Sequence, residues 1–151
     1  MEQMRVLAEE WSGKLHRTAT TVAGQTLRQV LQAMDCRLYV THSVVASVPR
    51  CAAGGPKEVF FFRVGRMLTH DELETEYVLR GYKPADPYRL AAVNSADPEF
   101  ADRHPNMTHW RDHTGEWCSL AFDTWQDGRV VFVYRQDNDW PEDWWYAAEA
   151  R

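Results

Sequence analysis

A cluster of histidines and aspartates lies between positions 102 and 113, and these residue types can perform acid–base or metal chemistry. The cluster makes a hydrolase or a metal-dependent enzyme one candidate function. The expected strand link would place His109 and His113 on opposite sides of a turn, and no H-E-x-x-H pattern is present. Turn and cap roles are therefore favoured, and neither a metal site nor a cofactor is predicted. The cluster comprises Asp102, His104, His109, Asp112 and His113.

Cysteine chemistry is a second candidate. Cys118 could act as a nucleophile with His109 or His113 as its base. Its place in an alternating strand pattern instead predicts a buried, inert thiol. The odd number of cysteines and the lack of a C-x-x-C unit argue against a disulfide framework and against a zinc site. We therefore expect reduced thiols at Cys36, Cys51 and Cys118.

The segment DWPEDWWYAAEAR, residues 139–151, combines tryptophans with acidic residues. Tryptophan is enriched at interface hot spots, and charge accelerates the encounter with an oppositely charged partner. This pattern predicts binding to a basic protein surface; the alternative is that the acids only maintain solubility. Changing Trp140 to alanine should weaken binding by about 2 kcal/mol or more without unfolding the protein. The candidate partner-binding residues are Asp137, Asp139, Trp140, Glu142 and Asp143.

Basic residues surround three consecutive phenylalanines, Phe60–Phe62, in the segment 57–66. Aromatic side chains interleaved with cations on a strand can bind single-stranded nucleic acid by stacking on its bases. The preferred interpretation is a half-buried strand with solvated ends, because the excess of positive charge is small. Nucleic acid is therefore an unlikely partner. The basic residues are Arg50, Lys57, Arg63 and Arg66.

The elements that must position these groups begin with an ambiguous segment. The stretch Trp11–Lys14 has the composition of a turn. It predicts a hairpin in which residues 5–10 pair with the threonine-rich segment 15–22. A helix that begins near Met4 is the alternative.

A helix and two strands are expected next. Apolar residues at helical spacing predict a helix over 27–34, with Thr26 as its N-cap. The segments 37–48 and 57–66 are rich in β-branched and aromatic residues, which favour strands. A mobile loop would join these two strands, because two glycines and two prolines lie close together there.

Three short helices with strong start signals are predicted after residue 68. The first has a capping box and a glycine that suits the end of a helix. The second and third each begin with an aspartate followed by a proline at the first helical position. The signals are Thr69 with Glu72, Gly81, Asp86 with Pro87, and Asp97 with Pro98.

Residues 107–150 are expected to form an antiparallel β-meander. A turn at 127–128 would set Gln126 opposite Arg129. Both faces of this hairpin are apolar, so neither is a plain solvent face.

The last strand of the meander is predicted at 144–149. It would place Trp145 on one face and both Trp144 and Tyr146 on the other. A tryptophan buries roughly 150–250 Å², so this strand should anchor the end of the chain. Truncation after Asp139 is expected to unfold or aggregate the protein.

The 151 residues, with 44% hydrophobic and 26% charged residues, fit a soluble globular protein. The net charge of −5 is uneven, since residues 1–68 carry +4 and residues 69–151 carry −9. The N-terminus lacks the features of a signal peptide and the apolar runs are too short to span a bilayer, which predicts a cytoplasmic protein. We expect an α+β fold in which a mixed part, 1–68, packs against short helices and a meander, 69–151.

The second half resembles a group of small proteins from bacteriophages, prophages and their bacterial hosts. The resemblance lies in RGYKPADPYRLAAVNSADPEFADRHPNMTHWRD, GEWCSLAFDTW and DNDWPEDWWYAA, and it covers residues 78–151. The group has no assigned activity, and these motifs carry no catalytic signature. The resemblance implies an accessory protein of a mobile element. A non-catalytic binding role is therefore the predicted function.

Overall fold

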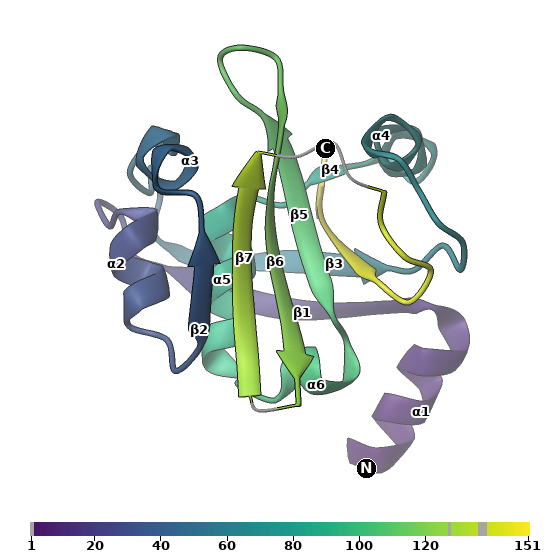
Figure 1. The fold of residues 1–151 in the computed structure, drawn as a ribbon. Helices are drawn as coiled ribbons and strands as arrows, with labels where there is room; N and C mark the ends of the chain where they lie inside the picture. Colours follow the sequence, from purple (N-terminus) through teal and green to yellow (C-terminus); the bar gives the residue numbers. More distant parts are fainter. Residues whose placement is uncertain (1, 127, 136–138) are drawn as a thin grey trace.

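Helices and strands alternate along most of the chain in the computed structural model, which describes residues 2–126, 128–135 and 139–151 (Figure 1). None of the helices in these ranges combines the length and the apolar character needed to cross a membrane. The helices are α1 (Glu2–Ser12), α2 (Leu27–Gln32), α3 (His42–Ser47), α4 (His70–Leu79), α5 (Pro87–Ala96) and α6 (Phe100–Arg103). The strands are β1 (Lys14–Thr21), β2 (Arg37–Val40), β3 (Gly55–Phe62), β4 (Tyr82–Pro84), β5 (Asn106–Arg111), β6 (Trp117–Trp125), β7 (Gly128–Arg135) and β8 (Trp145–Ala150).

The strands form one sheet in the order β1-β3-β8-β5-β6-β7-β2, and β4 pairs with β8 outside this path. Most pairings are antiparallel, which together with the separate helices confirms the α+β class. The parallel pairs are β2 with β7 and β5 with β8. The sheet is twisted, so that β1 and β3 run across the direction of β5, β6 and β7 (Figure 1).

Strand β8 lies in the middle of the sheet, although it comes last among the strands in the sequence. The strands β5, β6 and β7 form an antiparallel meander, as predicted. Strand β8 does not extend that meander beside β7. It pairs instead with β3 and β4 in antiparallel fashion and with β5 in parallel fashion. The alternation is as predicted, because Trp145 faces one core and both Trp144 and Tyr146 face the other.

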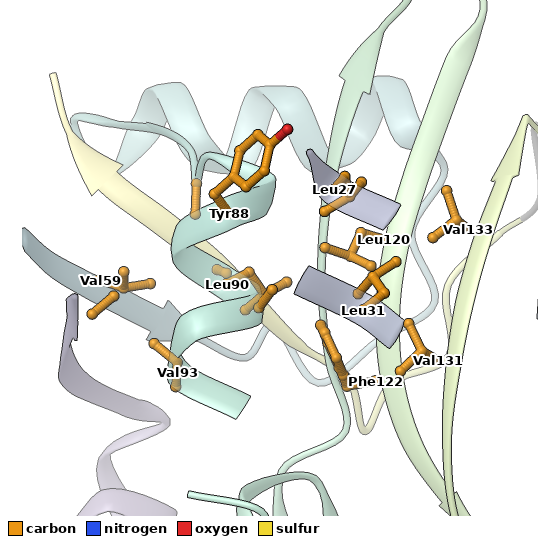
Figure 2. Packing of buried hydrophobic residues seen from close by; sticks show 14 of the residues in the cluster. Leu27, Leu31, Val59, Tyr88, Leu90, Val93, Leu120, Phe122, Val131 and Val133 are labelled. Atoms are coloured by element: carbon orange, nitrogen blue, oxygen red, sulfur yellow. The ribbon is translucent and has the colours of Figure 1, made fainter. Parts of the chain in front are cut away.

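The larger hydrophobic core fills the space between one face of the sheet and the helices α2 and α5 (Figure 2). Leu27 and Leu31 of α2 approach the apolar face of β6 and β7, while Val93 of α5 points toward Val59 of β3. The Tyr88 hydroxyl donates a 2.6 Å hydrogen bond to the Pro49 carbonyl, so its polar end is satisfied. Cys118 is a buried, free thiol in this core, as predicted.

A second core lies on the opposite face of the sheet under α4. Leu73 and Tyr77 of this helix are fully buried, and Tyr77 meets the ring of Phe62 edge-on at 5.2 Å. The Tyr77 hydroxyl donates a 2.7 Å hydrogen bond to the carbonyl of Ala147 in β8. The helix α4 is therefore fixed to the central strand by both apolar contact and a buried hydrogen bond.

The predicted N-terminal hairpin is wrong, and the helical alternative is observed. Residues 2–12 form α1, and the N–H of Gly13 donates to the carbonyl of Glu9 at the end of that helix. The threonine-rich strand β1 finds its partner in β3. Arg17 then joins the helix to the strand through a 2.8 Å ion pair with Glu9. The strand β1 therefore pairs with the distant strand β3 and not with residues 5–10, which precede it in the sequence.

The segment 37–48 is also divided differently from the prediction. Only Arg37–Val40 is extended, and residues 42–47 turn into α3. The helix buries Val44 and Val45 in the larger core. These β-branched side chains favoured a strand by local propensity, but tertiary packing decided their conformation.

The helix start signals with a side-chain cap are confirmed at three of the predicted positions. Thr26 and Thr69 each form a complete capping box, and Asp86 accepts from the N–H of Tyr88 with Pro87 at the first helical position. Gly81 follows α4 with φ +73°, a conformation that glycine adopts without strain. The cap predicted at Asp97 is wrong. Glu99 precedes α6, and Asp97 contributes its carbonyl to the N–H of Phe100.

The hairpin of β6 and β7 is present with a register shifted by two residues from the prediction. Trp125 lies opposite Gly128, whereas the sequence suggested Gln126 opposite Arg129. Gly128 is the first residue of β7 and has φ +141°, a conformation that glycine adopts without strain. A shift of two residues keeps each side chain on its face, because strand side chains alternate with period two. Asp127 lies outside the described residues.

Candidate functional site

A hollow of about 350 Å³ opens on the face of β6 and β7 that points away from the larger core. We call it the aromatic groove. One side comes from the strands and the other from the segment that leads into β8. Its residues are Ser119, Ala121, Asp123, Trp125, Phe132, Tyr134, Asp139, Trp140, Pro141 and Trp144.

The strand side of the aromatic groove is a continuous series of rings. Trp125 is 45% exposed, and its ring centre lies 5.3 Å from that of Phe132. Phe132 is in turn 5.6 Å from Tyr134 and stacks on Tyr39 of the neighbouring strand at 5.6 Å. The cross-strand contacts hold these rings in place, so their faces form a prebuilt apolar surface.

The opposite wall is formed by Trp140 and Trp144, whose rings meet edge-on at 5.0 Å. Trp140 lies outside the strands, but its backbone exchanges two hydrogen bonds with Leu68, of 2.7 and 3.0 Å. The wall is thus attached to the residue that precedes the α4 capping box. Trp140 is half-buried, whereas Trp144 is buried in the second core.

Carboxylates surround this groove. Asp139 lines it, and Glu142 and Asp143 are exposed beside it, while the predicted candidate Asp137 lies outside the described residues. Asp123 is half-buried at the groove, where burial and the nearby Asp143 raise the pKa of its carboxyl group. The four described acids of this group form no ion pair with another described residue; they are Asp123, Asp139, Glu142 and Asp143. The groove therefore combines aromatic faces with uncompensated negative charge.

The structure does not bring together the His/Asp cluster that suggested an enzyme. His104 lies in the larger core, edge-on to Trp145 at 5.0 Å, whereas His113 is exposed on the turn after β5. Asp112 organises that turn by accepting from the N–H groups of Thr114 and Glu116. No group of three metal-binding side chains occurs among the described residues. Strand alternation and a tight turn separate residues that are neighbours in the sequence.

Asp112 and Asp102 hold other parts of the fold. The Thr114 hydroxyl donates a 2.6 Å hydrogen bond to Asp112, and this bond, together with a 2.7 Å ion pair to Arg135, holds the pKa of the Asp112 carboxyl well below its usual range. Asp102 accepts from the Thr124 hydroxyl at 2.7 Å and pairs with Arg129 at 3.4 Å. Asp112 therefore has the predicted turn role, whereas Asp102 connects α6 to the hairpin of β6 and β7.

The basic aromatic strand is largely committed to the two cores. Phe61 and Phe62 are each 1% exposed and lie in opposite cores, while Phe60 is half-buried and stacks on Tyr82 at 5.3 Å. Arg66 forms ion pairs with residues of α4. Base stacking needs accessible ring faces, which Phe61 and Phe62 do not offer.

A buried histidine pair beneath the aromatic groove is a feature that the sequence analysis did not identify. His70 at the start of α4 and His109 of β5 are each 1% exposed, and their Nδ1 atoms lie 2.7 Å apart. His109 also contacts Glu74 through Nε2 at 2.6 Å, and the indole nitrogen of Trp140 lies 3.3 Å from His70 Nε2. Both imidazoles stack on the ring of Trp117. The pair thus connects a groove residue to a half-exposed carboxylate.

We predict that His109 makes the stability of the protein depend on pH. Burial lowers the pKa of His109 below its ordinary value of 6.5, although Glu74 opposes this shift. The unfolded chain then binds a proton more readily than the folded chain. The contribution of His109 to the free energy of unfolding should be fully present above about pH 6.5, its ordinary pKa, and should be lost as the pH drops toward the lower folded pKa.

Denaturant unfolding at a series of pH values would measure this effect. The variant His109→Asn removes the titrating group, so its unfolding free energy should vary less over that range. The exposed His113 supplies the matched control, and His113→Asn should leave the profile unchanged. Equal profiles for the protein and for His109→Asn would contradict the prediction. Glu74, whose pKa is lowered mainly by its hydrogen bond to His109, acts at more acidic pH, below its ordinary 4.5.

Comparisons with known proteins give no further guide, because no family model matches the sequence and no curated protein or solved structure shows significant similarity. The chemistry of the aromatic groove and of the histidine pair therefore carries the functional inference.

Proposed function

We propose that this chain is a binding protein that takes a basic segment of a partner protein into the aromatic groove. The observation that carries the proposal is the combination of exposed ring faces and uncompensated carboxylates in one hollow. The resemblance of residues 78–151 to phage and prophage proteins extends the proposal to an accessory role for a mobile element.

The groove suits lysine and arginine side chains for two physical reasons. A cation over an aromatic face gains about 0.5–1 kcal/mol at an exposed site and about 2 kcal/mol when desolvated. The same chain uses this contact internally, since the Arg111 guanidinium lies 4.1 Å from the ring centre of Trp117. Negative charge at Asp123, Asp139 and Asp143 would attract a basic segment and accelerate its association.

Catalysis has weaker support than binding. The His/Asp cluster is dispersed, and both nitrogens of His70 and of His109 are within hydrogen-bond distance of a neighbour inside the fold. A general base needs a ring nitrogen that faces the substrate. The stacking surface for nucleic acid is also reduced by the burial of Phe61 and Phe62.

Trp125→Ala is expected to weaken binding of a lysine-rich peptide by about 1–2 kcal/mol, because it removes the most exposed ring of the aromatic groove. The fold should be retained, since the side chain is 45% exposed. Trp140→Ala is a less direct test than the sequence suggested, because the indole also contacts His70 and Trp144. Fluorescence titration with the peptide at low and high salt measures both the ring and the charge contributions.

The matched control is Trp11→Ala on α1, where the indole is 91% exposed and distant in sequence from the groove residues. This variant should bind the peptide as the unchanged protein does. A glutamate-rich peptide should not bind, and high salt should weaken binding of the lysine-rich one. Affinity that is unaffected by Trp125→Ala and by salt, or the absence of binding, would contradict the proposed function.

A further inference from the structure

One arginine inside this chain contacts an aromatic ring and a carboxylate at the same time. The Arg111 guanidinium lies 4.1 Å from the ring centre of Trp117 and pairs with Asp71 at 3.2 Å. The indole nitrogen of Trp117 also donates to Asp71, at 3.3 Å. The ring, the cation and the carboxylate therefore form one unit, in which each member contacts the other two.

Two further arginines have the same two kinds of partner. Their guanidinium carbons lie 4.4 and 5.2 Å from a ring centre, and their nitrogens lie 2.6 and 2.8 Å from a carboxylate oxygen. A planar guanidinium allows both contacts at once, because its face lies on the ring while its N–H groups point outward in the plane. The two units are Arg80 with Phe62 and Glu76, and Arg17 with Phe100 and Glu9.

The aromatic groove offers the ring and the carboxylate of such a unit without the cation. Asp123 and Trp125 are two positions apart on β6, so their side chains leave the same face of the sheet beside each other. Phe132 extends the ring surface, with its centre 5.3 Å from that of Trp125. Among the described residues that line the groove, none is an arginine or a lysine.

We propose that the aromatic groove selects arginine over lysine, by placing one guanidinium of the partner's basic segment on the rings of Trp125 and Phe132 with its edge toward Asp123. The inference rests on the proposed function of the groove, and it adds the identity of the side chain that is recognised. Asp139, which also lines the groove, adds to the negative charge that attracts this cation.

The preference follows from the different hydration and shape of the two cations. The ammonium group of lysine is a compact, strongly hydrated point charge, whereas a guanidinium is planar and more weakly hydrated. Five of the ten residues that line the groove are aromatic, so the groove offers few acceptors to replace the water around an ammonium group. A guanidinium keeps its donors directed at a carboxylate while its face contacts the rings.

The size of the groove fits a side chain from an extended segment. Its volume of about 350 Å³ is near the lower end of the range for ligand pockets, about 300–1,000 Å³. A hollow of this size holds one long side chain and not a whole helix, whose diameter with side chains is about 10–12 Å. The ligand is therefore an arginine presented by a flexible or extended part of the partner.

The first test compares three peptides of equal length that differ only in the repeated residue, which is lysine, arginine or citrulline. Citrulline is planar like arginine but carries no charge. In fluorescence titrations of the full chain at low salt, the arginine peptide should bind at least about fivefold more tightly than the lysine peptide and about tenfold more tightly than the citrulline peptide. An arginine peptide that binds no more tightly than the citrulline peptide would overturn the inference.

The second test assigns the preference to residues of the groove. Asp123→Asn keeps an oxygen that can accept from the N–H of Thr124, as Asp123 does at 2.8 Å, and it should weaken binding of the arginine peptide at least about threefold. Trp125→Ala should reduce the ratio of the two affinities, arginine to lysine, to less than about twofold. The matched control Glu99→Gln removes an exposed charge before α6, outside the groove lining, and should leave the affinity and the ratio unchanged.

The outcomes separate this inference from the proposed function. Equal affinity for the arginine and lysine peptides would overturn arginine selection and leave the proposed function standing. No binding of either peptide would overturn the proposed function, and the inference would fail with it. Free arginine should bind at least about tenfold more weakly than the peptide, and equal binding would overturn the assignment of a protein partner. If a variant does not fold, the three peptides with the unchanged protein still decide the question.

Discussion

A chain truncated after Asp139 is expected not to fold. The truncation removes β8, which pairs with β3, β4 and β5 in the middle of the sheet. It also removes Trp145 and Tyr146, each 1% exposed, from the two cores. Loss of one such aromatic side chain costs about 3–5 kcal/mol. The whole stability of a small domain is about 5–15 kcal/mol, so the remaining residues cannot compensate.

Circular dichroism and thermal melting of the truncated chain would test this prediction. We expect no cooperative transition. The point variant Trp145→Ala should lower the melting temperature strongly, while Trp11→Ala, which changes a 91% exposed indole, should leave it almost unchanged. A truncated chain that melts cooperatively at the original temperature would show that β8 is dispensable.

The second large effect is expected at Arg89. Glu149 of β8 is 1% exposed, accepts a 2.6 Å hydrogen bond from the N–H of Asp86 and pairs with the Arg89 guanidinium. Arg89→Leu would leave a buried carboxylate without its counter-charge. Removing one partner of a buried ion pair destabilises a protein by about 3–5 kcal/mol, because the remaining charge is uncompensated. Chemical denaturation should therefore show a much earlier midpoint.

An exposed pair provides the control for this effect. Arg66 is 53% exposed and pairs with Glu72, which is 48% exposed, and with Glu76, which keeps Arg80 as a second partner. Arg66→Ala should therefore barely move the midpoint. The double variant Arg89→Leu with Glu149→Gln should recover part of the lost stability, since it removes the buried charge. If Arg89→Leu unfolds at the same denaturant concentration as the unchanged protein, the pair does not stabilise the fold.

The parts of the fold that the sequence predicted well depend on local chemistry. Thr69 and Glu72 satisfy each other's backbone groups within one turn, so the start of α4 can be recognised without tertiary information. Asp86 followed by Pro87 works in the same way. The alternation of the last strand was also readable, because it depends on the period of a strand rather than on its partners.

The incorrect predictions concern choices that distant residues make. The segment of α1 carries Met4, Leu7 and Trp11 at helical spacing, but these side chains are exposed, and the turn-like composition of residues 11–14 favoured a hairpin instead. The position of β8 depends on β3 and β5, which are far away in the sequence. No short-range pattern contains that information.

In the candidate site too, the features set by local sequence were predicted and those set by distant residues were missed. The sequence identified Trp140 and the nearby acids, and the structure places Trp140 and Asp139 in the aromatic groove with Glu142 and Asp143 beside it. The histidine pair was missed because His70 was taken as part of a helix start and His109 as part of a different cluster. Their contact spans 39 residues and is created by the packing of α4 on β5.

The central place of β8 has a consequence for how the protein is made. The edge of β3 that pairs with β8 carries Phe60–Phe62, and it stays open until residues 145–150 have left the ribosome. An unpaired, apolar strand edge is a template for pairing with other chains. Non-local pairings of this kind also form slowly. The nascent chain should therefore be most dependent on chaperones, and most liable to aggregate, in the interval between the synthesis of β3 and that of β8.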